Sequence, residues 1–550
     1  MALLDDARAW VAQDPDPVTR AELDALIARV SAGDTASLAD LTQRFSGRLQ
    51  FGTAGLRGEL GAGPMRMNRV LVAQAAAGLA TYLLGREPSP SVVIGYDGRH
   101  NSSVFARDSA AILTGAGVAA TLLPRPLPTP VLAFAVRELR MSAGIMVTAS
   151  HNPGRDNGYK VYLGGGDGGS QIVPPADGDI EAEITQAAAV AFSDRRTSND
   201  YSLAPESVVQ AYVARTAALA SVIQRPESQH LRHVYTAMHG VGRETATAVF
   251  AAAGFSAPIL VAAQADPDPD FPTVAFPNPE EPGAMDLAFA TAQDADADLV
   301  IANDPDADRV AVGIPTASGW VRLSGNEIGW LLGWRAARTH TSGTLACSLV
   351  SSPALREIAR VAGLDFVETL TGFKWISRVP GLIYGYEEAL GYLVDPDKVR
   401  DKDGISAAVA VLSLFCELRA AGTTLEQHLD EFALTFGAFD SSQISIRVAD
   451  LADISRAMAK LRAEPPTSIG GVAVASIEDF LTGVDGFPPN DILRIHTVDG
   501  GRIIVRPSGT EPKLKCYLDA SSADGTATER RAAAAVSVAR LEAGMRQLLE

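Results

Sequence analysis

The feature that most constrains this chain is an apolar run that ends abruptly in a polar loop. The run Ala143–Val147 is continuously apolar and is followed by Thr148-Ala149-Ser150-His151-Asn152-Pro153. A short run of this kind is typical of a strand buried on both faces, and the Asn-Pro-Gly that ends the loop breaks regular structure. The same order of strand, loop and helix recurs along the chain. This rhythm predicts mixed or mostly parallel sheets covered by helices, which is an α/β fold.

Reactive side chains gather where this strand meets its loop. Ser150 lies at the point where an α/β scaffold usually presents its chemistry. His151 is adjacent, and Lys160 follows on a second predicted strand, Gly158–Leu163. A hydroxyl, an imidazole and an amine so close in sequence are candidates for a nucleophile and its proton carriers. The alternative is that Ser150 and Asn152 only cap a turn.

Composition narrows the class of protein. The 550 residues are 47% hydrophobic and 20% charged, as in soluble globular proteins, and provide for about three or four domains. The net charge of -18 argues against nucleic acid or an anionic membrane as a partner. No signal peptide or membrane helix is expected. Three widely spaced cysteines are expected to be reduced, buried thiols of a cytoplasmic protein: Cys347, Cys416 and Cys516.

The order of predicted elements divides the chain into five segments. Apolar residues at helical spacing predict a helical N-terminal extension over residues 1–50, packed on the first domain. Polar, unpatterned residues near 193–206 mark a boundary. The remaining segments are predicted to be three α/β domains and a last region that ends in a long helix from about Thr526: residues 51–200, 207–318, 319–440 and 441–550.

Three aspartates follow the buried strand predicted over Leu299–Ala302, and these are Asp304, Asp306 and Asp308. Alternate residues of an extended segment point the same way, so the carboxylates should converge and repel one another unless a cation lies among them. An EF-hand is excluded, because Arg309 and Pro315 occupy its sixth and twelfth positions. Mg²⁺ with a phosphate oxygen as a further ligand fits well. The alternative is a metal-free acidic loop. Arg309 is expected to pair with the carboxylates or to contact a substrate.

Positive charge and hydroxyl groups concentrate in two stretches that contain glycine. The first is Phe51–Gly58, whose backbone amides and Arg57 suit a phosphate. The second is richer in donors for phosphate oxygens and consists of Arg506, Ser508, Gly509, Thr510, Lys513 and Lys515. The alternatives are a plain tight turn and a solvated basic turn.

Two further loops are predicted, over Thr371–Trp375 and Gly385–Tyr392. The second contains Glu387 and Glu388, whose carboxylates are suited to accept hydrogen bonds from sugar hydroxyls. Alternatively, the two glutamates lie at a helix N-terminus, where the macrodipole favours them.

Together these stretches resemble the α-D-phosphohexomutase family, the phosphoglucomutases and phosphomannomutases. The residues Thr148–Lys160 resemble its phosphoserine loop, Asp304–Arg309 its metal loop, Gly385–Gly391 its sugar loop and Arg506–Thr510 its phosphate loop, in the family's order and spacing. Pro305 and Ala307 stand where glycines are common. The resemblance implies three similar mixed-sheet α/β domains and a smaller C-terminal α+β domain around a central cleft.

The resemblance also implies a mechanism. Ser150 would carry a phosphoryl group, donate it to a sugar monophosphate and recover the other phosphate from the resulting bisphosphate. Substrate binding would draw the C-terminal domain onto the cleft. Mg²⁺ would be held by Ser150, Asp304, Asp306 and Asp308, and glucose 1,6-bisphosphate would be an activator. The partner would be a small phosphosugar, and the protein a monomer or homodimer. The implied catalytic residues are Ser150, Lys160, His151, Arg57 and Arg309. The implied substrate-binding residues are Lys374, Glu387, Glu388, Arg506, Ser508, Gly509 and Thr510.

One departure from the family pattern bears on the sugar. Ala389 stands where hexose enzymes often carry a serine, and with Phe373-Lys374 upstream it is more similar to the branch of phosphopentomutases and sugar-bisphosphate synthases. The predicted function is a mutase for the 1- and 6-phosphates of glucose, or of mannose. The alternatives are a mutase for the 1- and 5-phosphates of ribose or deoxyribose, a hydrolase in which Ser150 passes phosphate to water, and a non-catalytic metabolite-binding protein.

Overall fold

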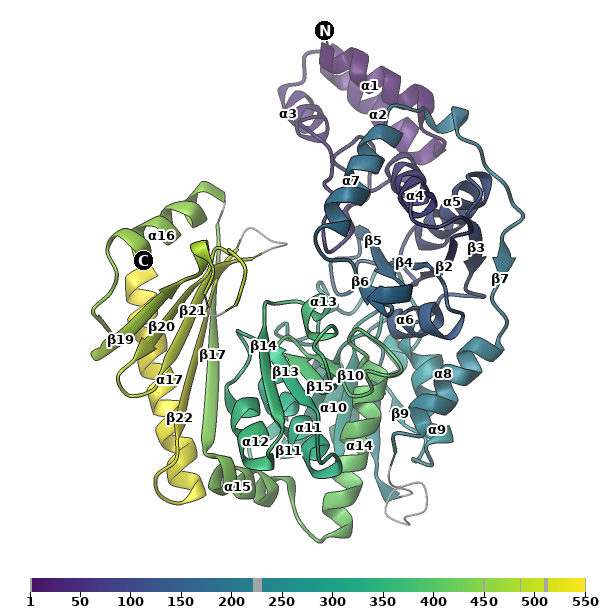
Figure 1. The fold of residues 1–550 in the computed structure, drawn as a ribbon. Coiled ribbons are helices and arrows are strands. Elements are labelled where there is room, and N and C mark those ends of the chain that lie inside the picture. Colours follow the sequence, from purple (N-terminus) through teal and green to yellow (C-terminus); the bar gives the residue numbers. More distant parts are fainter. Residues whose placement is uncertain (1, 221–229, 449–450, 485, 509–512, 550) are drawn as a thin grey trace. The chain divides into compact units, whose positions relative to one another are not determined.

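The computed structural model describes residues 2–220, 230–448, 451–484, 486–508 and 513–549, and its chain divides into two compact units (Figure 1). The first unit contains Met1–Leu323 and Ala389–Ser413, and the second contains Ser324–Glu388 and Leu414–Glu550. The fold is the predicted α/β class, with mixed sheets in the first unit.

The N-terminal extension is helical, as predicted. Its helices are α1 (Ala2–Gln13), α2 (Pro17–Ser31) and α3 (Thr35–Arg44). Asp16 caps α2 by accepting a hydrogen bond from the Val18 N–H, which is the usual role of an aspartate before a helical proline. The three helices share one apolar cluster that also contains Ala62 and Val70, so the extension packs on the domain that follows it.

The first sheet of the first unit has the strand order β1-β5-β4-β2-β3-β7, with β6 paired to β5. Strands β2, β3, β4 and β7 run parallel, whereas β5 returns antiparallel beside β4. Every residue of β4 is buried, because helices cover a mainly parallel sheet. The elements are β1 (Leu56–Glu59), α4 (Arg69–Leu84), β2 (Ser91–Tyr96), α5 (Ser102–Gly115), β3 (Ala119–Leu122), α6 (Thr129–Glu138), β4 (Ala143–Val147), β5 (Asp156–Leu163), β6 (Ser170–Gln171), α7 (Ala176–Ala187) and β7 (Ser202–Leu203).

The second sheet of this unit has the order β12-β11-β10-β8-β9. Strands β8, β9 and β10 are parallel, and β11 folds back antiparallel on β10. The connection between β10 and β11 carries the three aspartates. The elements are α8 (Ser207–Ala217), β8 (His233–Thr236), α9 (Gly242–Ala252), β9 (Ile259–Leu260), α10 (Asp286–Asp294), β10 (Leu299–Asn303), β11 (Val310–Thr316) and β12 (Gly319–Arg322), and the unit also holds β16 (Gly391–Leu393) and the start of α14 (Gly404–Ala420).

The second unit contains two sheets. In the first, β13 lies parallel between β14 and β15. In the second, the strands follow the antiparallel order β17-β22-β21-β20-β19-β18, and α17 packs along it. The elements are α11 (Gly325–Thr339), β13 (Thr344–Ser348), α12 (Ala354–Ala362), β14 (Asp365–Thr369), α13 (Phe373–Ile376), β15 (Leu382–Glu387), α15 (Leu425–Phe436), β17 (Ala438–Arg447), α16 (Leu451–Ala463), β18 (Ser468–Ile469), β19 (Val472–Asp479), β20 (Leu493–Thr497), β21 (Arg502–Pro507), β22 (Lys513–Ser522) and α17 (Ala527–Leu549).

Three predicted loops contain regular structure. Arg57 lies on β1 because that segment pairs with β5. The helical turn α13 replaces part of the loop predicted over Thr371–Trp375. Glu387 ends β15, so the alternative that placed the two glutamates at a helix N-terminus is wrong. The tyrosines of this segment favour a strand, and β13 supplies its partner.

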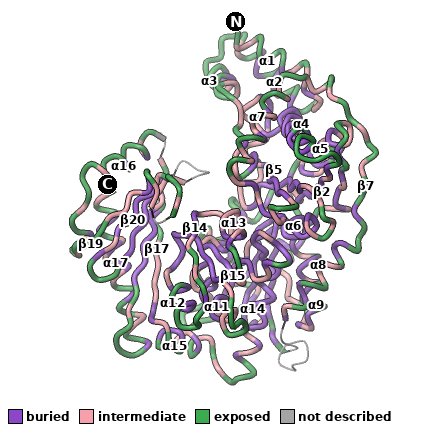
Figure 2. The backbone as a smooth tube through the Cα atoms, viewed as in Figure 1, coloured by how far each residue is buried: buried purple, intermediate pink, exposed green. Residues whose placement is uncertain are grey.

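The apolar interior follows the sheets. Figure 2 shows buried residues concentrated along the strands and exposed residues on outer helices such as α1 and α16. Cys347, Cys416 and Cys516 are free and buried, which confirms the expectation of buried thiols. No single helix of the described residues is long and apolar enough to cross a membrane, and α14 and α15 pass that test only as a bent pair.

Candidate active site

Ser150 lies three residues beyond the end of β4, in a strained backbone conformation. Its φ is +53°, in the left-handed region that side chains other than glycine rarely adopt. The Ser150 N–H donates to Thr148 Oγ1 at 2.9 Å, and the hydroxyl donates to Asp304 Oδ2 at 3.0 Å. Ser150 therefore points away from its own turn and toward the aspartate loop.

The strand register brings two of the predicted cations to the same edge. Lys160 pairs with Met146 near the end of β4, and Arg57 on β1 pairs with Gly158 on β5. The Arg57 guanidinium donates to Asn152 Oδ1 at 3.2 Å. His151 Nδ1 lies 3.4 Å from Ser150 Oγ. Burial and the nearby Arg309 and Arg57 guanidinium groups hold the pKa of His151 well below its usual value.

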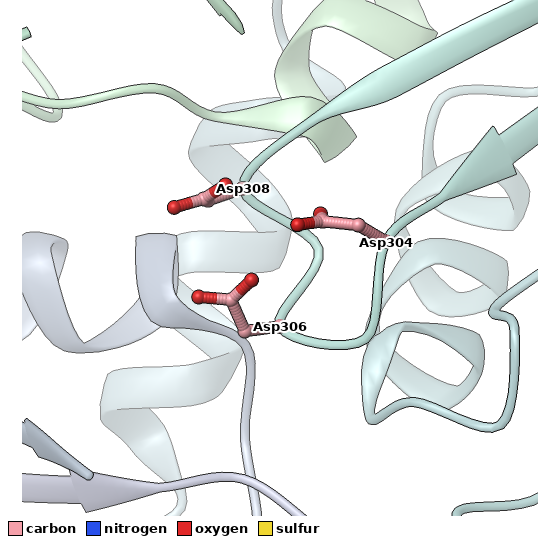
Figure 3. Close-up of side chains that lie close together, drawn as sticks. All are labelled: Asp304, Asp306 and Asp308. Carbon is pink, nitrogen blue, oxygen red and sulfur yellow. The ribbon is translucent and has the colours of Figure 1, made fainter. Parts of the chain in front are cut away.

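Asp304, Asp306 and Asp308 converge in the loop between β10 and β11, and Figure 3 shows their carboxyl groups gathered together. One ligand oxygen from each lies within 4.8 Å of the others, and all three residues are buried. The convergence was predicted, but its reason is a turn and not an extended segment. The Ala307 N–H donates to the Asp304 carbonyl at 2.8 Å, and the φ of Ala307 is +54°.

The aspartate loop rests on a glycine of the neighbouring β8–α9 connection. A Cβ on Gly240 would lie 2.2 Å from the Cα of Pro305, so only glycine allows this close approach. The Val241 N–H also donates to the Pro305 carbonyl at 2.8 Å. These backbone contacts therefore fix the position of the loop that carries the carboxylates.

One oxygen of each carboxylate contacts a lysine ammonium group or accepts a hydrogen bond from a hydroxyl. Lys160 Nζ lies 2.8 Å from Asp306 Oδ2 and 3.0 Å from Asp308 Oδ2, and Thr129 Oγ1 donates to Asp306 Oδ2 at 2.6 Å. Burial alone would lower the pKa of Lys160, but Asp306 and Asp308 outweigh burial and raise it. Burial, together with the charges of Asp306 and Asp308, raises the pKa of Asp304 well above its usual value.

The second oxygens of two carboxylates suit a metal ion. Asp306 Oδ1 and Asp308 Oδ1 are buried and have no hydrogen-bond partner among the described residues. Unpaired buried carboxylate oxygens are costly, and hard oxygen donors are the ligands that Mg²⁺ prefers. The donor set therefore fits a divalent cation.

Lys402 belongs to this cluster and was not found by sequence reasoning. Its Nζ lies 3.1 Å from Asp308 Oδ2. The segment that carries it is held by the buried Lys398, whose Nζ lies 2.8 Å from Asp403 Oδ2. A Cβ on Gly404 would lie 2.3 Å from the Arg309 carbonyl oxygen. The available signal was the alternation of charges in Asp401-Lys402-Asp403 directly before an apolar helix.

Arg309 contacts both the aspartate loop and the segment that includes Ala389. Its N–H donates to Asp304 Oδ1 at 3.0 Å, and its Nε lies 3.7 Å from Asp308 Oδ1. The guanidinium also donates to the Ala389 carbonyl. Arg309 therefore pairs with the carboxylates, which is one of the two roles expected for it.

The predicted sugar and phosphate residues lie in the second unit, where a turn joins two of them. The Gly372 N–H donates to Glu387 Oε1 at 2.6 Å, and the Arg506 guanidinium donates to Thr371 Oγ1. Lys374 follows on α13. Arg506 lies on β21 and is partly exposed, as is Ser508. Gly509 and Thr510 lie outside the described residues.

Glu388 is held by two serines of the β13 end. Its Oε2 accepts hydrogen bonds from Ser348 Oγ and Ser351 Oγ, each at 3.2 Å, and its N–H donates to Ser351 Oγ at 3.1 Å. This carboxylate is anchored within its own unit, and the neighbouring Glu387 is bound to the turn that also meets Arg506.

Sequence models of four domains match the chain. Their descriptions are phosphoglucomutase/phosphomannomutase alpha/beta/alpha domains I, II and III and C-terminal domain, and they match residues 48–191, 210–317, 324–435 and 444–536. Together they span most of the chain after the helical extension.

Similar proteins carry related names. A "probable phosphomannomutase" of Haemophilus influenzae is 54% identical over 88% of this chain and 98% of its own length. The human phosphopentomutase is 34% identical over 95% of this chain and 92% of its own. A crystal structure of a phosphoglucomutase/phosphomannomutase family protein from Burkholderia thailandensis has a TM-score of 0.69 at 21% identity, covering 91% of this chain and 96% of that one.

Proposed function

Because this chain belongs to the phosphoglucomutase/phosphomannomutase family, an isomerase family of phosphotransferases, we propose that it interconverts the 1- and 6-phosphates of a hexose, glucose or mannose, through a phosphoserine at Ser150. The observation that carries the proposal is the hydrogen bond from Ser150 Oγ to Asp304 within a buried carboxylate cluster. That contact places the serine hydroxyl beside carboxylate oxygens suited to bind a cation, and such a cation stabilises a transferring phosphoryl group.

The reaction consists of two transfers that balance each other. In the first, the bond between Ser150 Oγ and phosphorus breaks, a sugar hydroxyl oxygen takes the phosphoryl group, and the hydroxyl proton passes to a base. In the second, the other phosphate of the sugar bisphosphate returns to Ser150 Oγ, and the sugar oxygen it leaves takes a proton. Serine is regenerated as phosphoserine, and the sugar phosphate leaves as its isomer.

Residues around Ser150 support these transfers. His151, with Nδ1 at 3.4 Å from the serine oxygen, and Lys160 are the acid–base candidates. Arg57 and Arg309 supply guanidinium groups beside the loop. Positive charge placed where the phosphoryl group moves stabilises the charge that develops in the transition state.

Asp304, Asp306, Asp308 and Ser150 would hold Mg²⁺, which neutralises negative charge on a transferring phosphoryl group when it is bound. Asp306 Oδ1 and Asp308 Oδ1, which have no hydrogen-bond partner among the described residues, are the feature that fits the ion. Glucose 1,6-bisphosphate would act as an activator by phosphorylating Ser150 when the serine has lost its phosphate.

The second unit supplies the groups proposed to bind substrate. Arg506, with its planar fork of donors, and Ser508, Gly509 and Thr510 would hold the phosphate that does not react. Glu387, Glu388 and Lys374 would contact the sugar and its hydroxyls. A fixed phosphate anchor with shared hydroxyl contacts allows one site to process a sugar in two orientations.

A second candidate function is a phosphopentomutase acting on ribose or deoxyribose 1- and 5-phosphates. Ala389 favours it, because alanine removes a hydroxyl that hexose enzymes of the resembled family often carry at this position. The human phosphopentomutase, similar over nearly the whole chain, also supports it. Neither observation bears on the phosphoryl transfer itself, since Ser150 and the carboxylate cluster are common to both functions.

A mutase assay on four sugars tests the proposal. Glucose, mannose, ribose and deoxyribose 1-phosphates are each supplied with Mg²⁺ and a trace of glucose 1,6-bisphosphate. We expect one hexose phosphate to dominate, and we expect Ser150→Ala to abolish turnover and incorporation of phosphate into the protein. Ser193→Ala, at an exposed serine, is the matched control and should match the wild type.

Each other outcome points to a specific alternative. A pentose phosphate that dominates replaces the hexose assignment by the phosphopentomutase. Steady release of inorganic phosphate without any isomer indicates a hydrolase. A Ser150→Ala protein with normal turnover contradicts the phosphoserine mechanism, and a wild type that only binds the sugars is a binding protein.

A further inference from the structure

The Arg99 side chain donates hydrogen bonds to four carbonyl groups of the Ser150 loop. It follows β2 in the segment Tyr96-Asp97-Gly98-Arg99. Its Nη2 lies 2.6 Å from both the Ser150 and the Asn152 carbonyl oxygens. Its Nη1 lies 2.8 Å from the Pro153 and 3.1 Å from the Asp156 carbonyl oxygen. One side chain thus gathers the carbonyl groups of a seven-residue loop.

The guanidinium itself is held in place on two sides. Asp97 Oδ2 lies 3.4 Å from Arg99 Nε, and Ser102 Oγ donates to Asp97 Oδ1 at 2.6 Å. The ring of Phe271 covers the guanidinium, with 4.9 Å between the Arg99 Cζ and the ring centroid. Arg99 is only 4% exposed. A buried cation with a carboxylate, a ring face and four acceptors has little freedom to move.

Phe271 belongs to a segment without helix or strand between Asp266 and Pro282. Its φ is +47°, a conformation that costs energy for an aromatic residue. The same segment passes close to the Ser150 loop, since a Cβ on Gly154 would lie 2.8 Å from the Pro269 carbonyl oxygen. This segment therefore supports Arg99 and the Ser150 loop together.

Four carbonyl dipoles that converge on one point repel one another unless a cation lies among them. Arginine meets this need because its planar fork carries five donors in fixed directions, whereas lysine offers a compact charge with three donors. The loop also holds Ser150 in the left-handed region, which the surroundings must stabilise. The carbonyl of Ser150 is itself one of the four acceptors.

We propose that Arg99 is a positioning residue for phosphoryl transfer, which holds the Ser150 loop so that the serine oxygen faces the carboxylate cluster. The proposal rests on the proposed function, because positioning matters only if Ser150 reacts. Arg99 donates to loop carbonyls and not to the groups assigned to the sugar. Its loss should therefore lower kcat and leave KM unchanged. Misplacement of a reacting group by about 1 Å costs about 100-fold in rate.

The test compares Arg99→Lys with the wild type in the mutase assay and in hydrogen exchange. We expect kcat of R99K to fall by about 30- to 100-fold, with KM within about twofold and a lower melting temperature, because lysine satisfies fewer of the four buried carbonyl groups. We also expect faster exchange in the peptide 148–157, where the Asn152 and Asp156 N–H groups donate to loop carbonyls at 3.0 Å. Arg155→Lys is the matched control, because Arg155 lies in the same loop with its side chain 73% exposed.

The exchange measurement separates this proposal from the proposed function. If the wild type converts no sugar phosphate, the proposed function fails, and exchange alone decides whether Arg99 holds the loop. Unchanged exchange in R99K overturns the proposal, and so does a kcat within threefold of wild type or a loss equal to that of R155K. Should R99K not fold, Phe271→Leu keeps all four donors and removes the ring. A fall in kcat of about 3- to 10-fold with faster exchange supports the proposal, and unchanged exchange contradicts it.

Discussion

The two units treat their polar groups differently. In the first unit, Ser150, Lys160 and the three aspartates are all nearly or fully buried, and each contacts another member of the set. In the second unit, Lys374, Glu388, Arg506 and Ser508 remain partly exposed. The groups proposed to exchange the phosphoryl group are preorganised inside one unit. Of the groups proposed to bind substrate, these four keep surface that a ligand can cover, whereas Glu387 is buried.

Preorganisation in the first unit carries an electrostatic cost. Three carboxylates without solvent repel one another, and burial of each charge is unfavourable. Lys160 and Lys402 offset part of this repulsion through contacts of 2.8 to 3.1 Å. Such a cluster is expected where a site must hold charge in place during a reaction. Substitutions in the first unit should therefore change kcat, whereas those in the second unit should change KM.

The largest effect is expected from Asp308→Asn, which removes a charge that contacts both lysines. We expect kcat to fall by about 10²- to 10³-fold, with a smaller change in KM and a higher Mg²⁺ concentration needed for half-maximal rate. Steady-state kinetics across a Mg²⁺ titration measures both. Asp294→Asn, at an exposed position on α10, is the control. A D308N enzyme that loses only substrate affinity would remove the distinction between the units.

The next effect is expected from Arg506→Gln in the second unit. Loss of a charged hydrogen bond to phosphate corresponds to about 1.5–3 kcal/mol, so KM should rise by about 10- to 100-fold while kcat stays within about threefold. Initial rates over a wide range of sugar phosphate concentration resolve the two constants. Arg546→Gln on α17, whose guanidinium pairs with Glu542 on the same helix, should leave both constants unchanged. A fall in kcat with constant KM would place Arg506 with the reaction centre instead.

A smaller effect is expected from Ala389→Ser, which restores a hydroxyl at the position that departs from the family pattern. One added hydrogen bond of about 1 kcal/mol should raise the ratio of kcat/KM for glucose 1-phosphate over ribose 1-phosphate by about fivefold. Both substrates are measured on the same preparation. Ala362→Ser on α12, at an exposed position, is the control. An unchanged ratio would show that Ala389 does not set the choice of sugar.

The proposed reaction centre was more predictable from the sequence than the elements around it. Apolar runs that end in polar loops locate Ser150 and the aspartates, because burial fixes β4 and β10 whatever their neighbours are. Arg99 and Lys402 were missed, because their importance lies in contacts with residues far away in the chain. Strand β15 was taken for a loop for a related reason. Its tyrosines favour a strand, and β13 supplies the partner strand.

The smallest effect concerns a buried histidine whose pKa is shifted mainly by burial. His233 on β8 is fully buried, and burial lowers its pKa from 6.5 to about 4. Between these two values the unfolded chain binds a proton that the folded protein does not, so stability must fall as the pH decreases from 6.5 to 4. The shift corresponds to at most about 3 kcal/mol.

Replacing His233 by leucine removes this proton uptake and should flatten the decline. Melting temperatures at pH 7, 6, 5 and 4.5 measure it, with the drop from pH 7 to 4.5 smaller in H233L than in the wild type. His340→Leu, at the exposed end of α11, controls for the loss of a histidine and should decline like the wild type. The titration of the carboxylate cluster is common to all three proteins and cancels in the comparison. Equal declines in H233L and wild type would mean that His233 binds its proton in the folded protein. Burial would then not lower the pKa of this imidazole.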